Sequence, residues 1–187
     1  MTEQAEWFAL KGEVALVTGA SRGIGAAIAD ALGRAGATVI GSATTPEGAD
    51  TISQRFASAG IAGRGVVLDV SDVDSIAAVQ KDIAGQEGAV TLLVNNAGIT
   101  RDNLLMRMKD EEWEDILRTN LSSAFYTCRA FMRGMLKARH GRIVNIVSVV
   151  GAMGNPGQAN YAAAKAGLVG FSKSVAVSYT HLTLPTM

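Results

Sequence analysis

Three side chains in the C-terminal third of the sequence have the chemistry that reduction of a carbonyl group requires. Tyr161 and Lys165 stand four residues apart in an Ala-rich stretch, so on a helix both lie on one face. An ammonium about 4 Å from a phenol oxygen stabilises the phenolate by roughly 4 kcal/mol at an effective dielectric of about 20. Ser148 ends the apolar run that begins at Arg142, which predicts a strand that brings the hydroxyl to the same place. The three residues predict that Tyr161 acts as a general acid. The alternative is that the spacing of Tyr161 and Lys165 is due to chance.

A glycine-rich turn follows the first apolar run and opens a helical stretch. Its glycines, Gly19, Gly23 and Gly25, are spaced Gly-x-x-x-Gly-x-Gly. Glycines at a strand-to-helix turn let the backbone approach a pyrophosphate, whose charge is stabilised by the helix N-terminus. The turn predicts a dinucleotide site, with a merely tight connection as the alternative.

The residues after the second apolar run indicate which dinucleotide binds. A fold that selects NAD usually places an acid there against the ribose 2′-hydroxyl, but the run ends at Thr44 and Thr45 without Asp or Glu. Arg22 in the glycine-rich turn is available to a 2′-phosphate instead. The missing acid and the available arginine together favour NADP. The alternative is that Arg22 is only a solvated turn residue.

Two further polar positions follow the third and fourth apolar runs. Asp69 could accept a hydrogen bond from the adenine amino group, and the small Ala97 and Gly98 leave room for a cofactor beside the glycine-rich turn. Alternatively, Asp69 caps the helix that begins near residue 71, and residues 95–96 only form a turn.

Asn120 lies between apolar neighbours inside a long helix expected from about residue 111 to 139. A carboxamide is a poor helix former and needs partners there. Asn120 is expected to bond a backbone carbonyl or to hold a water near Lys165, or else to be a satisfied core amide.

Short, continuous apolar runs alternate with helix-patterned stretches. This alternation predicts an α/β fold with a doubly wound parallel sheet of Rossmann type, covered on both faces. The expected strands are 14–18, 38–41, 65–68, 91–94 and 143–147. No repeat or linker separates them, so residues 1–187 are expected to form a single domain.

Composition excludes several classes of partner. The 17 Lys and Arg residues balance the 17 Asp and Glu residues, and no basic patch favours nucleic acid or an anionic membrane surface. Every apolar run is too short to cross a membrane, and the acidic start is unlike a signal peptide. A cytoplasmic location is expected. The single Cys128 has no metal-ligand spacing, so no metal site is expected.

The motifs taken together resemble the short-chain dehydrogenase/reductases. They are Thr18-Gly-Ala-Ser-Arg-Gly-Ile-Gly25, Asn95-Asn-Ala-Gly98, Asn120, Ser148 and Tyr161-x-x-x-Lys165. Within that family, residues 99–108 and 148–160 look like the 3-oxoacyl-acyl-carrier-protein reductases of bacterial type II fatty-acid synthesis. The resemblance covers about residues 8–174. It implies NADPH-dependent reduction of a 3-oxoacyl group on acyl carrier protein to the 3-hydroxyacyl group, and a homotetramer for the full-length family.

The resemblance also implies a role for each matching residue. Tyr161 would donate the proton, Ser148 would bind the substrate carbonyl, and Lys165 would hold the nicotinamide ribose and favour the phenolate. Asn120 would maintain a proton-relay water, and Arg139 would meet the acidic carrier protein. The expected cofactor-binding set is Gly19, Ser21, Arg22, Gly23, Ile24, Gly25, Thr44, Asp69, Val70, Asn96, Ala97 and Gly98, with Tyr161 and Lys165.

The sequence departs from the family after Ser174. Residues 175–187 form a Thr-rich tail, where the family would complete the helix and add a sixth strand, a substrate-covering loop and a seventh strand. We therefore expect an incomplete domain with a non-family tail, prone to aggregation and without measurable turnover. A cofactor-binding remnant without activity is one alternative function. A dehydrogenase of the same superfamily acting on a sugar or a steroid is another.

Overall fold

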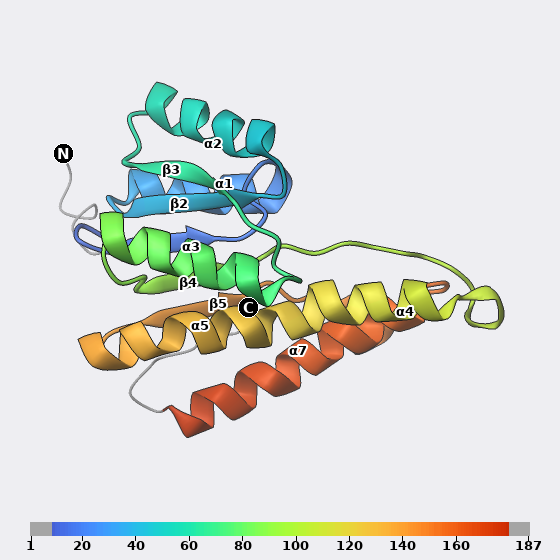
Figure 1. Cartoon of the computed structure of the whole chain (residues 1–187). Helices are drawn as coiled ribbons and strands as arrows, with labels where there is room; N and C mark the ends of the chain where they lie inside the picture. The colour runs from blue at the N-terminus through green and yellow to red at the C-terminus, as the bar shows by residue number, and fades with distance from the viewer. Residues whose placement is uncertain (1–8, 180–187) are drawn as a thin grey trace.

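A computed structural model describes residues 9–179 of the chain. Five parallel strands form one sheet in the order β3-β2-β1-β4-β5 (Figure 1). The strands are β1 (Val14–Val17), β2 (Thr38–Ala43), β3 (Gly63–Val67), β4 (Leu92–Asn95) and β5 (Arg142–Asn145). The chain runs outward from β1 to β3 and then returns to β4, so the strand order reverses between β1 and β4. This confirms the predicted doubly wound, Rossmann-type sheet.

Helices cover both faces of the sheet. The α-helices are α1 (Gly23–Arg34), α2 (Pro46–Ser58), α3 (Val73–Gln86), α4 (Asp110–Leu117), α5 (Ser123–Ala138), α6 (Val150–Met153) and α7 (Ala159–Ser178). A 3-10 turn, η2 (Leu105–Arg107), and a π-helical segment, η3 (Arg118–Ser122), complete the elements. In Figure 1, α3, α5 and α7 lie in front of the sheet.

The two faces bury separate apolar clusters. One cluster joins Leu16, Leu93 and Ile143 of the strands to Ile83 of α3 and Phe131 of α5. The other joins alternate strand positions to α1 and α2, where Ile52 and Phe56 are fully buried. Because side chains alternate between the faces of a strand, two covered faces require continuously apolar strands. This requirement explains why short, continuous apolar runs in the sequence predicted all five strands.

The last strand ends earlier than the apolar run predicted. β5 stops at Asn145, so the expectation that Ser148 closes the strand is wrong by three residues. The reason is the partner strand: Asn145 pairs with Asn95, the last residue of β4, and one further bond joins Ile146 N to Asn95 O at 2.9 Å. Beyond it the chain turns toward α6.

The expected helix from residue 111 to 139 is interrupted. The α4 helix ends at Leu117, η3 contains one wide π turn, and α5 resumes at Ser123. A π turn inserts an extra residue into an α-helix and is frequent at functional sites. This segment holds Asn120, which is only 2% exposed.

The final helix continues past the predicted family boundary. α7 extends through Ser178, so the first residues of the expected tail 175–187 are helical. Residues 180–187 lie outside the described part of the chain. Within residues 9–179, no helix combines the length and apolar composition that a membrane span requires.

Candidate active site

A cleft of about 540 Å³ opens at the carboxyl ends of the strands and collects the predicted catalytic trio. Ser148, Tyr161 and Lys165 line it together with Arg22 and Asn96. The remaining lining residues are Ile24, Gly98, Ile99, Thr100, Arg101, Ile146 and Val147. The cleft therefore joins the trio to part of the expected cofactor-binding set at the edge where doubly wound sheets bind ligands.

Tyr161 and Lys165 share one face near the start of α7, as their spacing predicted. The Lys165 ammonium lies 5.7 Å from the centroid of the Tyr161 ring and donates a hydrogen bond to the Ile146 carbonyl at 2.7 Å. Lys165 is 5% exposed, and this burial lowers the pKa of its ammonium. A buried cation with one hydrogen bond remains available to a hydroxyl or phenolate that enters the cleft.

The start of α7 is anchored by Asn160, which is fully buried. Its Nδ2 donates to the carbonyls of Arg101 at 3.0 Å and Glu112 at 3.1 Å, while its Oδ1 accepts from Tyr161 N at 2.8 Å. These bonds fix the backbone that carries the tyrosine. Sequence reasoning missed Asn160, although an amide directly before Tyr161 in an Ala-rich stretch was a usable signal.

Ser148 lies in the loop between β5 and α6. Its Oγ accepts a hydrogen bond from Val150 N at 3.2 Å. A hydroxyl that accepts from the backbone keeps its proton for another acceptor. In the cleft, that acceptor can be a substrate carbonyl oxygen.

The glycine-rich turn is tight, and its glycines are required by its geometry. Gly19 has φ 65° and Gly23 has φ 59°, a region that side chains other than glycine rarely adopt. A Cβ at Gly25 would collide with the Gly19 carbonyl oxygen. The backbone before the α1 N-terminus is thus open to a phosphate.

Asn96 and Thr18 hold this turn against the end of β4. Asn96 Nδ2 donates to the carbonyls of Thr18 at 2.9 Å and Gly19 at 3.1 Å. Thr18 Oγ1 accepts from Asn96 N and from Ala97 N, each at 3.0 Å. The alternative that residues 95–96 are a simple turn is wrong, because Asn95 ends β4 and donates to Asn145 Oδ1 of β5, while Asn96 bonds the end of β1. Thr18 is a second residue that sequence reasoning missed, and its hydroxyl joins the end of β1 to the end of β4.

Three other expected cofactor residues lie along the same edge but outside the cleft lining. Thr44 and Asp69 are exposed, and Val70 is buried. Asp69 Oδ1 accepts from the backbone and hydroxyl of Ser71, at 2.8 and 2.7 Å. The cap of α3 is Asp72, which accepts from Asp74 N at 2.9 Å, so the alternative of Asp69 as the cap is wrong. One carboxylate oxygen of Asp69 thus shapes a turn, and adenine recognition by this residue stays a prediction.

Asn120 bonds the loop that follows β4. Its Oδ1 accepts from Ile99 N and its Nδ2 donates to Ile99 O, both at 2.8 Å. The side chain also lies close to Gly98, where a Cβ would approach Asn120 Oδ1 to 2.8 Å. Asn120 therefore fixes one wall of the cleft, and the relay water stays a prediction.

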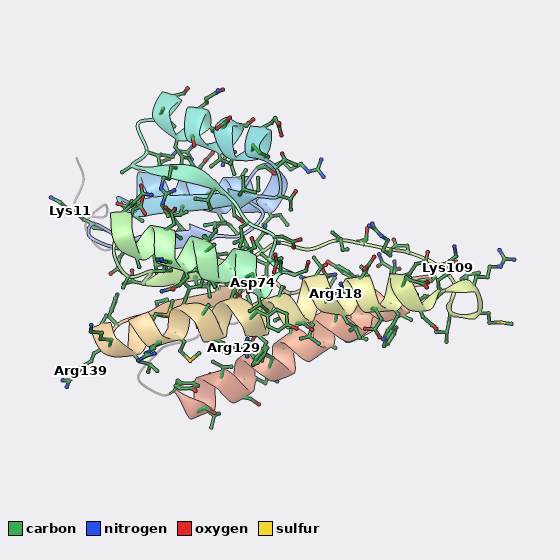
Figure 2. All side chains as sticks on the ribbon, viewed as in Figure 1. Lys11, Asp74, Lys109, Arg118, Arg129 and Arg139 are labelled. Carbon is green, nitrogen blue, oxygen red and sulfur yellow. The ribbon has the colours of Figure 1, made fainter. Side chains whose placement is uncertain are left out.

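Arg139 lies away from the cleft. It follows α5 in a left-handed conformation, φ 51°, three residues before β5 begins. The start of a parallel strand lies at the amino edge of the sheet, opposite the cleft. Figure 2 shows Arg139 at the end of α5 remote from Arg118.

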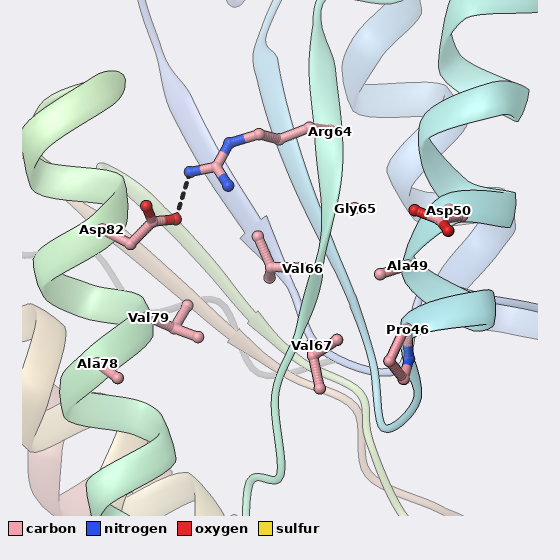
Figure 3. A pocket seen from close by; sticks show the side chains of 10 residues that line it. All are labelled: Pro46, Ala49, Asp50, Arg64, Gly65, Val66, Val67, Ala78, Val79 and Asp82. Carbon is pink, nitrogen blue, oxygen red and sulfur yellow. Dashed lines mark hydrogen bonds and ion pairs between the residues drawn. The ribbon is translucent and has the colours of Figure 1, made fainter.

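A second hollow of about 400 Å³ lies beside β3, between α2 and α3 (Figure 3). Arg64 crosses it to Asp82 at 2.6 Å and also bonds Glu87 at 2.7 Å. The hollow contains none of the predicted site residues.

The residues present fit a nicotinamide dinucleotide. An open glycine-rich turn precedes α1, Arg22 faces the cleft, and no acid stands at Ser42, Ala43 or Thr44 to oppose a 2′-phosphate. The trio lines the same cleft. This donor set matches a phosphate-containing ligand next to a carbonyl substrate.

Comparison with known proteins identifies the family. The model of the short chain dehydrogenases matches residues 13–183. This chain belongs to the short-chain dehydrogenase family. It is 63% identical over 166 residues to the 3-oxoacyl-acyl-carrier-protein reductase FabG of Escherichia coli (strain K12), covering 89% of this chain and 67% of the relative. The FabG proteins of Pseudomonas aeruginosa and Haemophilus influenzae are 60% and 58% identical over 167 residues, again 89% of this chain and 68% of each relative.

A solved structure supports the fold. A short-chain alcohol dehydrogenase structure from Sinorhizobium meliloti 1021 superposes with a TM-score of 0.91 at 37% sequence identity. The superposition covers 96% of this chain and 72% of the other. The chain thus spans about two thirds of the length of the reductases that it matches in sequence.

Proposed function

We propose that the chain reduces 3-oxoacyl groups carried by acyl carrier protein to 3-hydroxyacyl groups with NADPH, in type II fatty-acid synthesis. One observation carries the proposal: Ser148, Tyr161 and Lys165 converge on a cleft that also receives Arg22 of the glycine-rich turn. The identity of 58% to 63% to proteins named as 3-oxoacyl-acyl-carrier-protein reductases supports the choice of substrate.

Each side chain of the trio has a distinct task in this proposal. Ser148 donates its proton in a hydrogen bond to the substrate carbonyl oxygen and orients it. Tyr161 transfers its phenolic proton to that oxygen as negative charge develops there. The Lys165 ammonium stabilises the resulting phenolate. NADPH, when bound, supplies the hydride to the carbonyl carbon.

Arg22 and the glycine-rich turn select and hold the cofactor in this proposal. The guanidinium pairs with the 2′-phosphate, and backbone amides near the α1 N-terminus receive the pyrophosphate. Ser21, Gly23, Ile24, Thr44, Asp69 and Val70 belong to the same proposed cofactor site.

The carrier protein is the proposed partner. Arg139 offers it a positive charge, but this residue lies at the edge of the sheet opposite the cleft, so within one chain it does not border the reaction. The homotetramer stays a prediction. A cytoplasmic location is part of the proposal.

The test is oxidation of NADPH with a 3-oxoacyl thioester of acyl carrier protein, followed by the absorbance of the reduced nicotinamide. It compares the 187-residue chain, for which no measurable turnover is expected, with a version that carries the C-terminal segment of the family. Substrate-dependent oxidation by the longer version that is lost in Tyr161→Phe supports the proposal. NADPH binding without oxidation by the longer version would instead identify a cofactor-binding remnant. Turnover of sugar or steroid alcohols with NADP, and none of the thioester, would reassign the substrate.

A further inference from the structure

Arg55 of α2 bonds the glycine-rich turn from behind. Its guanidinium donates through Nη2 to the Ala20 carbonyl at 2.9 Å and through Nη1 to the Ser21 carbonyl at 3.4 Å. Its Nε donates to Asp30 Oδ1 of α1 at 3.0 Å. The side chain is 24% exposed, so the guanidinium is held in a fixed place between α1 and α2.

The two contacted carbonyls continue a series. Asn96 already holds the carbonyls of Thr18 and Gly19. Arg55 holds the next two, so four consecutive carbonyls of the turn are fixed by side chains. Because a trans peptide is planar, its N–H points opposite to its C=O.

The orientation of the amides follows from this series. The N–H groups of Gly19 and Ala20 are used by Ser42, whose Oγ and carbonyl accept them at 3.2 and 2.8 Å. The peptides that Arg55 grips carry the N–H groups of Ser21 and Arg22, which consequently point away from Arg55. These amides are the last ones before α1 begins at Gly23, where an anion is favoured.

We infer that Arg55 is a positioning residue for the dinucleotide: it orients the Ser21 and Arg22 amides without touching the ligand. This inference rests on the proposed dinucleotide binding. An arginine suits the role because its planar fork can satisfy two carbonyls and a carboxylate at once, which an ammonium cannot do in one geometry. Pre-orientation of the amides lowers the ordering cost of binding.

The experiment compares Arg55→Met with the wild-type chain. Methionine keeps an aliphatic stem for packing beside Phe56, whose ring centroid lies 5.3 Å from the guanidinium carbon. We expect the dissociation constants of NADPH and NADH to rise by a similar factor of about ten, a loss comparable to one good hydrogen bond. Loss of NADPH affinity alone would overturn the inference, since it would mean that Arg55 contacts the 2′-phosphate.

Three further variants isolate the carbonyl contacts. Asp30→Asn removes the ion pair and should leave both affinities within about twofold of wild type. Arg64→Met removes another partly buried arginine that bonds two carboxylates, far from the turn, and should leave them unchanged. Arg55→Lys keeps the charge without the fork, so recovery of full affinity by this variant would contradict the role assigned to the fork.

Amide hydrogen exchange in the ligand-free chain separates this inference from the proposed function. Arg55→Met should accelerate exchange of the Gly19 and Ala20 amides, which are bonded to Ser42, because it loosens the turn that holds them, while Arg64→Met should not. Unchanged exchange in a folded Arg55→Met chain would overturn the positioning role. If the wild-type chain binds neither dinucleotide, the proposed function fails, whereas faster exchange would still support the role of Arg55 in the turn.

Discussion

Lys165 is a charged residue in a buried position. The residue is 5% exposed, and its one described hydrogen bond goes to the Ile146 carbonyl. Removal from water destabilises the charged ammonium relative to the neutral amine, and this lowers the pKa of Lys165. A cation in this condition gains more from a nearby phenolate or hydroxyl than a solvated one does, so its burial and its proposed task are linked.

The stability of the chain should reveal this burial through pH. Burial lowers the pKa of Lys165 from 10.5, so between the lowered value and 10.5 the unfolded state binds more protons, and stability rises with pH. Relative to Lys165→Met, the wild-type free energy of unfolding should therefore increase as the pH approaches 10.5. Urea denaturation across a series of pH values measures it. A difference that stays constant with pH for Lys165→Met would refute the argument.

Replacement of the proposed acid should affect the chemical step alone. In a version with the C-terminal segment of the family restored, Tyr161→Phe keeps the ring and removes the proton donor, so turnover should fall by about 100-fold or more, on the scale of general acid catalysis. The affinity for NADPH should change little. Steady-state kinetics and a binding titration check the two halves. Near-normal turnover would show that another group donates the proton.

Cofactor choice should depend on Arg22. In Arg22→Ala the affinity for NADPH should fall by about 10- to 100-fold, since a charge-assisted contact to phosphate is lost, while that for NADH should hardly change. Titration of both dinucleotides measures the ratio. Equal affinities of the wild-type chain for NADPH and NADH would already disprove the predicted selection.

At the scale of elements, a buried polar relay ties the catalytic helix to the sheet. Asn95 of β4 donates to Asn145 Oδ1 of β5 at 2.8 Å, and Asn145 donates to Ser172 Oγ of α7 at 2.8 Å. Thr127 of α5 donates to Asn95 Oδ1 at 2.7 Å. All four residues are buried, and the most exposed, Asn95, is 8% exposed. Such a relay fixes the relative positions of β4, β5 and α7 because each unpaired member would be costly.

Removal of one relay hydroxyl should therefore destabilise the fold. Ser172→Ala leaves Asn145 Nδ2 without its acceptor, and should lower the free energy of unfolding by about 1–3 kcal/mol. Ser178→Ala is a matched control. The hydroxyls of Ser172 and Ser178 both donate to the carbonyl four residues earlier on α7, but Ser178 is exposed and is not part of the relay. Urea denaturation should show little change for the control. Equal effects of the two substitutions would mean that the relay adds no stability.

The sequence predicted the elements whose signals are local. Each apolar run predicted a strand because both faces of the sheet are covered, and the spacing of Tyr161 and Lys165 predicted that the two residues share one face of a helix. The relay, the grip of Arg55 on residue 20 and the anchoring by Asn160 depend on partners that are tens of residues away. The π turn and the early end of β5 likewise reflect tertiary bonds, so composition and periodicity could not reveal them.

At the scale of the whole molecule, the two outer strands are protected differently. The β3 edge is covered by α2, which packs on Gly65. The Gly65 N–H, on the side of β3 away from β2, donates to Ser53 Oγ of α2 at 2.8 Å. β5 pairs with β4 on one side, and within residues 9–179 no strand pairs with its other side. An unpaired edge with apolar residues on both faces, here Ile143 and Val144, favours pairing with another chain.

The 187-residue chain should accordingly self-associate as its concentration rises. Light scattering and size-exclusion chromatography across a dilution series measure this. We expect the associated fraction to fall on dilution, so ligand titrations belong at the lowest practical concentration. A monomer that unfolds cooperatively at every concentration would show that the β5 edge is protected.

The π turn at η3 permits a change of length that the regular helix after it does not. In a regular α-helix one residue corresponds to a rotation of about 100°, so a deletion within α5 would turn Cys128 and Phe131 away from the sheet. The wide turn at η3 already holds one residue more than an α-helical turn. Deletion of a single residue there would let the segment become regular and leave α5 close to its present orientation. The same deletion would displace Asn120 from its two bonds to Ile99, so we expect it to disturb the wall of the cleft more than the fold.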